Sequence, residues 1–323
     1  ADARRADALP RLMKGHRVVV SALPYYYNLA LTRAALRAGC HFCDLGGNSA
    51  LVRRQLALGP QAARRGLGIL PDCGLSPGLA SIVGAAAVRE LRRPRSLRIW
   101  IGGLPVEPRA PLDYQIVFSV EGLINEFDEP CRILRGGVPT DVAPLTEIEP
   151  LQFAGWPPLE AFMTSGGTST LPDTFRSRLE VVEEKTIRYA GHAQVMAGLR
   201  ALGFFSAKRA PGLACAPREL TARLFERAWR GQGADAVLLR VVAAGEGESI
   251  TCEADIRSDS DLGLSAMARA TALPLSICAQ MLADGRIAGR GGLTQEEGVP
   301  AATMLAEMEK RGIRLRLARR EGR

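Results

Sequence analysis

Short apolar runs and helix-like segments alternate along the first part of the chain. The strand-like runs are rich in Val, Leu, Ile and Phe, and Gly, Pro or Asn follows each of them. The runs cover residues 17–22, 40–45 and 67–71; the helix-like segments cover 3–14, 25–38, 49–65 and a stretch that reaches Leu91. Strand, turn and helix repeated three times predict a parallel sheet with crossover helices.

Beyond Arg95 the pattern changes. Residues 97–101 alternate between apolar and polar positions, and we expect Gly102 and Gly103 to end this strand. Further strands are expected at 179–188, 236–243 and 249–257, and further helices at 192–202, 217–229, 264–283 and 301–312. Longer strands with fewer crossovers favour a mixed or antiparallel sheet with helices on one face. We therefore predict a first domain over 1–95, a second over 96–263, and C-terminal helices over 264–323 that pack back on the first domain, with Pro274 a possible kink.

Composition narrows the class of protein. The 323 residues are 47% hydrophobic and 24% charged, which is typical of a globular chain. The net charge is +8, but residues 310–323 hold seven basic side chains against Glu321, so this end alone accounts for +6. We expect a solvated basic tail and no nucleic-acid partner, because no aromatic residue is interleaved with these charges.

Three further expectations concern location and cysteine chemistry. The longest uncharged stretch, 73–88, is too short and too rich in Gly and Pro to span a membrane, so no membrane partner is expected. No apolar segment follows the first charged residues, which favours the cytoplasm and reduced thiols for the seven cysteines. Cys40 and Cys43 form a CxxC pattern on opposite faces of a predicted strand, and no metal is expected there.

The ends of the three predicted parallel strands are the candidate ligand site, because ligands of open parallel sheets bind beyond the carboxyl ends of strands. The candidate cofactor-binding residues are small or backbone-exposing: Ser21, Ala22, Leu23, Pro24, Asp44, Gly46, Gly47, Gly74, Leu75, Ser76 and Pro77. No G-x-G-x-x-G follows a strand and opens a helix. For a dinucleotide binder, we expect the first β-α unit upstream of Ala1.

Two later segments carry polar groups suited to a substrate. Residues 164–170 are rich in hydroxyls and glycine, and they form either an anion cradle or a plain polar loop. Residues 185–192 place Arg188, Tyr189 and His192 near a strand-to-helix turn, with His192 either catalytic or a capping residue. Glu121 is either a functional carboxylate or a favourable acid in the first turn of a helix.

Several segments in this order resemble the saccharopine dehydrogenase/reductase family. They are SALP at 21–24, DLGG at 44–47, PDCGLSPG at 71–78, GGLP at 102–105, PLDY at 111–114, FSVEGL at 118–123 and TIRYAGH at 186–192. Within the family, PLEAFMTSGGTSTL at 158–171 is most similar to the L-lysine 6-dehydrogenases. The resemblance implies a Rossmann domain lacking its N-terminal unit, followed by an α+β domain for substrate binding and assembly into a homodimer or homotetramer.

The resemblance also implies an activity: NAD-dependent oxidative deamination of the ε-amino group of L-lysine to 2-aminoadipate 6-semialdehyde, with NADP not excluded. Saccharopine-type members resemble the segment but place Arg where Gly167 stands, which favours a smaller amine here. The alternatives are a saccharopine or carboxynorspermidine dehydrogenase, or an inactive scaffold.

The roles expected from the resemblance divide between substrate binding and catalysis. Arg188 with the hydroxyls of Thr168 and Ser169 would hold the α-carboxylate of the small amino-acid substrate, within a loop that also contains Gly166 and Gly167. The expected catalytic residues are Asp72, orienting groups near the nicotinamide; Glu121, pairing with an ammonium; and Tyr189 or His192, handling protons.

Overall fold

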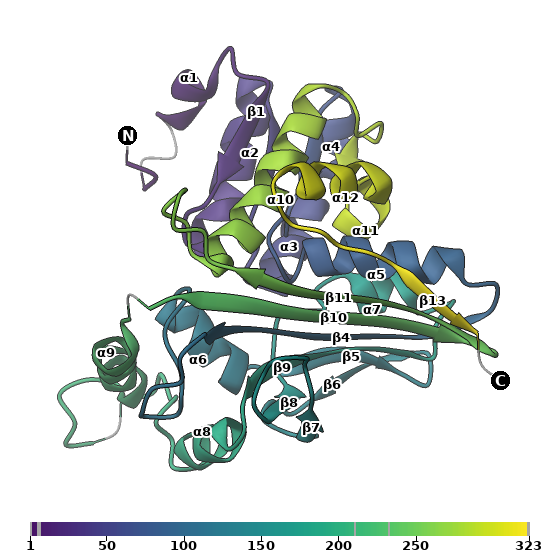
Figure 1. Cartoon of the computed structure of the whole chain (residues 1–323). Coiled ribbons are helices and arrows are strands. Elements are labelled where there is room, and N and C mark those ends of the chain that lie inside the picture. Colours follow the sequence, from purple (N-terminus) through teal and green to yellow (C-terminus); the bar gives the residue numbers. More distant parts are fainter. Residues whose placement is uncertain (1, 5–7, 210, 232, 322–323) are drawn as a thin grey trace.

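The chain folds around two β-sheets. The computed structural model describes residues 2–4, 8–209, 211–231 and 233–321. A small parallel sheet lies above a large mixed sheet in Figure 1, with helices between and around them. Residues 5–7 of the predicted first helix and Arg323 of the basic end lie outside the described residues.

The small sheet has the parallel order β1-β2-β3-β12. Its strands are β1 (Val18–Ser21), β2 (His41–Asp44), β3 (Gly68–Leu70) and β12 (Gly291–Gly292). Helices α1 (Leu9–Met13), η1 (Tyr25–Tyr27), α2 (Asn28–Ala38), α3 (Ser49–Leu56) and α4 (Gly59–Ala63) precede or connect the first three strands. The predicted repetition of strand, turn and helix is confirmed, as is the Rossmann-like α/β class.

Alternate residues of this sheet enter different cores, because neighbouring side chains of a strand point to opposite faces. Phe42 and Ile69 pack with residues of α1 and α2. Cys43 and Leu70 pack on the other face, with residues of α10 (Ala266–Ala283). Cys40 belongs to the first core and Cys43 to the second, so the CxxC thiols are separated by the sheet. Both are free and buried.

The large sheet has the order β13-β11-β10-β4-β9-β5-β6, with β8 paired to β9 and β7 paired to β8. Its strands are β4 (Pro94–Pro105), β5 (Cys131–Arg135), β6 (Val138–Val142), β7 (Glu149–Leu151), β8 (Leu159–Met163), β9 (Val181–Tyr189), β10 (Asp235–Gly245), β11 (Glu248–Arg257) and β13 (Ala318–Glu321). Only β4 and β9 pair in parallel; the other pairs are antiparallel. This is the mixed sheet that the later pattern predicts.

Strand β4 does not end at Gly102 and Gly103, as the sequence pattern suggested. It continues to Pro105. A Cβ at Gly102 would stand 2.2 Å from the carbonyl oxygen of Ile187 in β9, and one at Gly103 would stand 2.7 Å from the Met267 side chain. The glycines therefore allow close approach of neighbouring groups within the strand, which is the other common reason for glycine in a sheet.

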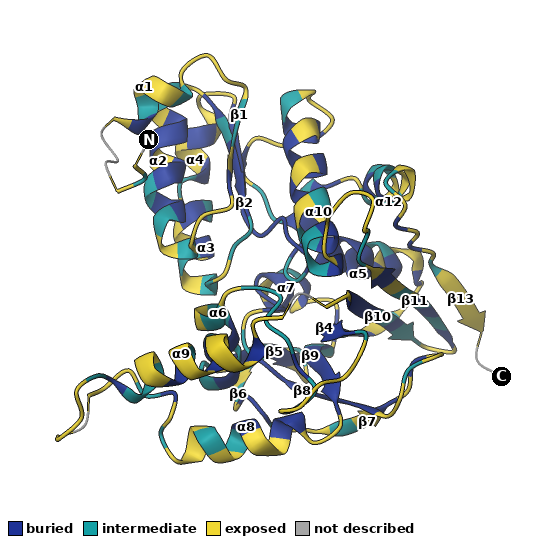
Figure 2. Cartoon of the chain, turned by 60° about the vertical axis from the view of Figure 1, so that its left-hand side comes forward, coloured by how far each residue is buried: buried dark blue, intermediate teal, exposed yellow. Residues whose placement is uncertain are grey.

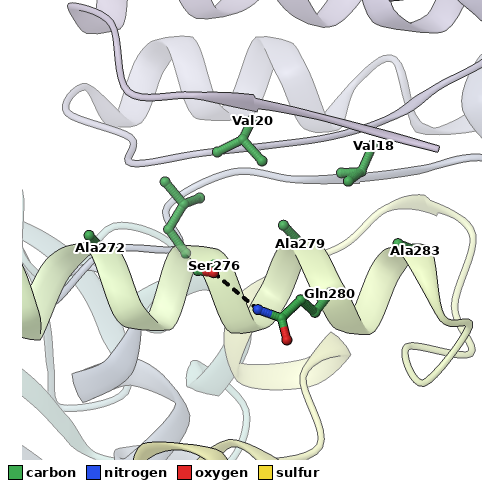
Figure 3. A pocket seen from close by; sticks show the side chains of 8 residues that line it. Val18, Val20, Ala272, Ser276, Ala279, Gln280 and Ala283 are labelled. Carbon is green, nitrogen blue, oxygen red and sulfur yellow. Dashed lines mark hydrogen bonds between the residues drawn. The ribbon is translucent and has the colours of Figure 1, made fainter. Parts of the chain in front are cut away.

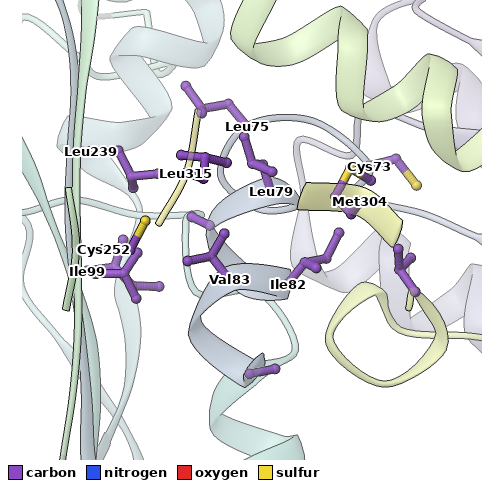
Figure 4. Close-up of a cluster of buried hydrophobic side chains, with 14 of the residues drawn as sticks. Cys73, Leu75, Leu79, Ile82, Val83, Ile99, Leu239, Cys252, Met304 and Leu315 are labelled. Carbon is purple, nitrogen blue, oxygen red and sulfur yellow. The ribbon is translucent and has the colours of Figure 1, made fainter. Parts of the chain in front are cut away.

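The remaining helices pack against the large sheet or against other helices. They are α5 (Leu79–Glu90), α6 (Val120–Asp128), α7 (Leu171–Phe175), α8 (His192–Ala201), α9 (Pro217–Trp229), α11 (Gln295–Gly298) and α12 (Ala301–Lys310). Helix α5 lies along β4 and β10, and Leu79, Ile82 and Val83 meet Ile99 and Leu239 there (Figure 4). This apolar layer joins the two sheets into one core.

The chain returns to the small sheet after β11. Helix α10 contacts β1, β2 and β10, and β12 extends the small sheet beside β3. Pro274 lies inside α10 without dividing it. This helix is long and apolar enough to cross a membrane by length and composition, but 56% of that stretch is buried inside the fold, as in a core helix.

The basic end is more ordered than a solvated tail. Strand β13 pairs antiparallel with β11 while its side chains stay exposed (Figure 2). Arg319 donates to a carboxylate oxygen of Glu248 over 2.5 Å and to the backbone oxygen of Glu90 over 2.8 Å. The side chains of Ala318–Glu321 are exposed, as a solvated basic end implies, but their backbone pairs with the edge of β11, which charge patterns do not reveal.

Candidate functional site

The three strand-end loops lie side by side at one edge of the small sheet. Loop 44–47 is central: a Cβ on Gly46 would stand 1.7 Å from a carboxylate oxygen of Asp72, and a Cβ on Gly47 would stand 3.0 Å from Cβ of Tyr25. Both glycines also have positive φ, 71° and 116°. Glycine is therefore required where this loop passes between the other two.

The first of these loops forms an exposed rim. Ser21 is buried and its hydroxyl donates to the side-chain oxygen of Asn28 over 2.8 Å. Ala22, Leu23 and Pro24 are exposed. Their backbone is therefore accessible to a ligand, whereas the Ser21 hydroxyl already has a partner.

Asp44 and Asp72 lie at the same sheet edge, as their positions after β2 and β3 predict. The backbone N–H groups of Gly46 and Asp72 donate to Oδ1 of Asp44 over 2.7 and 3.2 Å, and Gln55 donates to its Oδ2 over 2.6 Å. Burial raises the pKa of Asp44, while these three donors act in the opposite direction. Asp44 therefore holds the loops together.

Asp72 connects the small sheet to the second domain. It is buried, its φ is +60°, and its Oδ2 accepts a 2.5 Å hydrogen bond from the hydroxyl of Ser169. Burial raises the pKa of Asp72 to about 7, and the Ser169 hydrogen bond opposes the rise. The expected substrate contact of Ser169 is thus replaced by a contact between domains.

A cavity of about 180 Å³ lies where the loop after β3 meets β4, β9, α6 and α10. Its walls combine candidate cofactor residues with residues of the second domain. They include Leu45, Gly74, Leu75, Ser76, Pro77, Ile101, Gly102, Gly103, Phe118, Glu126, Glu184, Thr186, Arg188, Met267 and Thr271. Of the predicted residues, Gly74 to Pro77 and Arg188 are brought together here.

Arg188 is the cation of this cavity. It is 3% exposed, and its Nη1 donates to the Ile187 carbonyl oxygen over 2.8 Å. Its Nη2 lies 3.7 Å from Oε2 of Glu126, its guanidinium lies 5.0 Å from the Tyr114 ring centroid, and its Nε–H has no hydrogen-bond partner. A guanidinium with unused donors suits a carboxylate ligand.

Other polar atoms beside Arg188 are also unsatisfied. Among the residues that the structure describes, the Tyr114 hydroxyl and Oε2 of Glu126 are buried without hydrogen-bond partners. Burial raises the pKa of Glu126 to about 7, although the Arg188 guanidinium acts to lower it, and burial raises the pKa of Tyr114 to about 12. Buried polar atoms ordinarily have partners, so this group is arranged to meet a ligand.

Glu184 supplies a second carboxylate. It is 5% exposed, and its Oε2 accepts a 2.6 Å hydrogen bond from the hydroxyl of Ser76. Burial raises the pKa of Glu184 to about 7 against this hydrogen bond. Residues 184, 186 and 188 share one face of β9, because side chains alternate along a strand. That alternation is the signal in the sequence that could have identified Glu184.

Glu121 was the wrong carboxylate of α6 for this cavity. Its side chain is 59% exposed and pairs with Arg218 over 2.9 Å. Glu126 follows it by five positions, which corresponds to a rotation of about 140° around a helix. The two carboxylates therefore face different directions, and Glu126 is the one that lines the cavity.

Tyr189 and His192 do not line the cavity. The Tyr189 hydroxyl donates to the Pro105 carbonyl oxygen over 2.8 Å. His192 is 1% exposed among the rings of Tyr114, Phe127, Phe162 and Trp229, and burial lowers its pKa to about 3. The expected proton-transfer roles are therefore wrong for this geometry, since Tyr189 is engaged and His192 is enclosed as a neutral ring.

The expected anion cradle at 166–169 is largely used within the protein. Thr168 donates to the Arg132 carbonyl oxygen over 2.5 Å, and Ser169 donates to Asp72. Gly166 has φ +104°, and a Cβ placed there would meet nothing within 4 Å. Gly167 lies directly under the Glu184 carboxylate, so this loop shapes the cavity rather than presenting hydroxyls to it.

A second hollow, of about 320 Å³, lies between β1 and α10 (Figure 3). Val18, Val20, Ala272 and Ala279 face it, and Gln280 donates to the Ser276 hydroxyl over 3.1 Å. No charged side chain lines it among the described residues. Although larger, it offers no group for catalysis, so the cavity around Arg188 is the candidate active site.

These features define a two-domain α/β protein with a polar cavity between a dinucleotide-type sheet and a second domain. The model of the saccharopine dehydrogenase NADP binding domain matches residues 1–70, and that of the saccharopine dehydrogenase C-terminal domain matches residues 74–313. The chain belongs to the saccharopine dehydrogenase family.

Curated relatives and a solved structure agree with this assignment. The NADP(+)-dependent, L-glutamate-forming saccharopine dehydrogenase of Schizosaccharomyces pombe is 24% identical over 70% of this chain and 52% of its own length. The enzyme of the same name from Pyricularia oryzae is 23% identical over 64% of this chain and 47% of its own length. The chain thus spans about half the length of these relatives.

The apo L-Glu-forming saccharopine dehydrogenase from Saccharomyces cerevisiae has a similar structure. The TM-score is 0.81 at 17% identity, over 99% of this chain and 88% of that chain. At this identity the likeness establishes the shared fold.

Proposed function

We propose that this chain forms the substrate and cofactor site of an NAD(P)-dependent oxidoreductase that oxidatively deaminates the ε-amino group of L-lysine. The observation that carries the proposal is the charge pattern of the cavity. Arg188 is the single cationic side chain among its lining residues, which also include two carboxylates, Glu126 and Glu184. Lysine carries the complementary pattern of one carboxylate and two amino groups.

The cofactor side of the proposal rests on the small sheet. Leu45 and Gly74 to Pro77, from its strand-end loops, line the cavity at the carboxyl edge of a parallel sheet, where a dinucleotide would approach. When bound there, the nicotinamide supplies hydride acceptance. The protein's own groups then hold the substrate: Arg188 its carboxylate, and the two glutamates its amino groups.

Saccharopine is the second candidate substrate, because the relatives bear that name. It carries more carboxylates than lysine. Each would need a cation or donor, and a carboxylate facing Glu126 or Glu184 would be repelled. The charge pattern therefore favours lysine, while the family alone favours saccharopine. Carboxynorspermidine is a further alternative for the same kind of site.

The test is a substrate comparison at alkaline pH, where more of the ε-amine is neutral. The purified protein is incubated with NAD or NADP and with lysine, saccharopine or carboxynorspermidine, and appearance of the reduced cofactor is followed. Lysine should give the highest kcat/KM. Equal or better turnover with saccharopine would overturn the lysine assignment, and a folded protein inactive with all three amines would support a scaffold role.

A further inference from the structure

Glu184 differs from Glu126 in what surrounds its charge. Glu126 lies 3.7 Å from the Arg188 guanidinium, whereas no Lys, Arg or His lies within ion-pair distance of Glu184 among the described residues. Its Oε2 accepts from Ser76, and its Oε1 makes no hydrogen bond among the same residues. A buried carboxylate without a cation is costly, so this position calls for a positively charged ligand group.

Gly167 makes room for this carboxylate. A Cβ at Gly167 would stand 1.8 and 1.9 Å from the two carboxylate oxygens of Glu184, so any other residue there would force the carboxylate to move. The Ser76 hydroxyl lies between the two residues, 2.6 Å from Glu184 and 3.5 Å from the Gly167 carbonyl oxygen. Ser76 from one domain and Gly167 from the other therefore fix the carboxylate in a single place.

The position of Ser76 decides which amino group meets Glu184. Ser76 belongs to the loop after β3, on the side of the cavity where the parallel strands end. Arg188 and Glu126 form the other charged group of the cavity, and Arg188 lies four residues from Glu184 on the same face of β9. A substrate whose carboxylate binds Arg188 would extend its distal end toward Glu184 and the cofactor side.

We infer that Glu184, fixed by Ser76 and Gly167, is the specificity-determining residue that binds the distal ammonium of the substrate. The inference rests on the proposed function, because it assigns one end of the proposed substrate to one carboxylate. It follows that the pocket selects against substrates whose distal end is anionic.

The experiment compares Glu184→Gln with Glu121→Gln, a matched control on the exposed face of α6. Gln keeps the size of the side chain and an oxygen for Ser76 but removes the charge. We expect Glu184→Gln to raise KM for lysine by about 10- to 100-fold and to leave KM for the cofactor unchanged. Glu121→Gln should match the wild type within about twofold.

A second variant, Gly167→Ala, keeps the charge but occupies the space of the carboxylate. It should also raise KM for lysine. Ser76→Ala provides a third variant if Gly167→Ala prevents folding. Unchanged KM and kcat for lysine in Glu184→Gln, with the wild type active, would overturn the inference and leave the proposed function standing.

Direct binding measurements distinguish the proposed lysine oxidation from the proposed ammonium site at Glu184. Calorimetric titration with n-pentylammonium, in the presence of NAD, should detect binding to the wild type and at least tenfold weaker binding to Glu184→Gln. If the wild type binds this probe through Glu184 but oxidises no lysine, the proposed substrate fails and the ammonium site stands. If neither lysine nor the probe binds to the wild type, both are overturned.

Discussion

The loops of the small sheet and the wall formed by β9 meet at one cavity but are built from different chemical groups. The loop side consists of close backbone contacts at Gly46, Gly47 and Gly78, whose side chains would collide with neighbours. The β9 side presents Glu184 and Arg188 as buried charges. The loop side is therefore fixed by close packing of backbone, whereas the β9 side presents the buried charges that a small charged ligand would contact.

The largest effect is expected from Gly78→Ala, on the loop side. Gly78 has φ +135°, and its Cβ would stand 2.2 Å from the Gly74 carbonyl oxygen and 2.6 Å from the Gly74 nitrogen. Backbone strain and overpacking together should lower the free energy of unfolding by on the order of 3 kcal/mol. Urea denaturation measures this change. Gly155→Ala is the control, since Gly155 also has positive φ but no atom near its Cβ site.

Arg188→Ala tests the β9 side. It removes the cation proposed to hold the substrate carboxylate, and kcat/KM for lysine should fall by about 10- to 100-fold, mainly through KM. Cofactor affinity should stay near that of the wild type, because Arg188 belongs to the charged wall. Steady-state kinetics with each ligand varied in turn provide the measurement. If KM rose for the cofactor alone, Arg188 would bind the cofactor and not the substrate carboxylate.

Asp72→Asn tests the contact between the two domains. Its readout is the pH dependence of the free energy of unfolding. Burial holds the pKa of Asp72 at about 7, above the value near 3.8 of an ordinary Asp, so the folded chain retains a proton that the unfolded chain releases. This stabilising contribution is complete below about pH 3.8 and is lost as pH rises through 7.

Thermal or urea unfolding at several pH values measures that dependence. The wild type should lose roughly 2 to 3 kcal/mol between pH 5 and pH 8 from this group, and Asp72→Asn should flatten the slope. Asn also tolerates the positive φ at this position. Glu126 and Glu184 also have raised pKa values and remain in the variant, so some loss of stability with rising pH is expected to persist. If the variant and the wild type lost stability equally with pH, the role of Asp72 would be contradicted.

The smallest effect is expected at the edge of the large sheet. Arg319→Ala removes the hydrogen bonds to Glu248 and Glu90. Because the arginine is partly exposed, the free energy of unfolding should fall by about 1 kcal/mol or less. Arg320→Ala, at the neighbouring exposed position of β13, is the control and should leave stability unchanged. Identical stabilities of the two variants would show that the basic end contributes nothing through Arg319.

Local patterns predicted most of the elements and the edge of the sheet where the site lies. The apolar runs before Asp44 and Asp72 are strands, and both residues lie at one edge, because strand periodicity and the polarity of parallel strands are local properties. Arg188, singled out from its place near the end of a strand, lines the cavity. Strands β5 to β8 were not predicted, although β5 and β6 form a hairpin whose two-residue turn, Gly136-Gly137, is a local signal.

The sequence by itself determined the alternation of strands and helices, the positions of the strand-end glycines and the charge carried by each segment, because these depend on neighbours within a few residues. Only the tertiary structure decided which charges face the cavity. Glu126 and Glu184 enter it while Glu121 remains outside, His192 is enclosed by aromatic rings, and Ser169 turns to Asp72. These outcomes depend on helix rotation and on contacts between residues about a hundred positions apart, which no local pattern specifies.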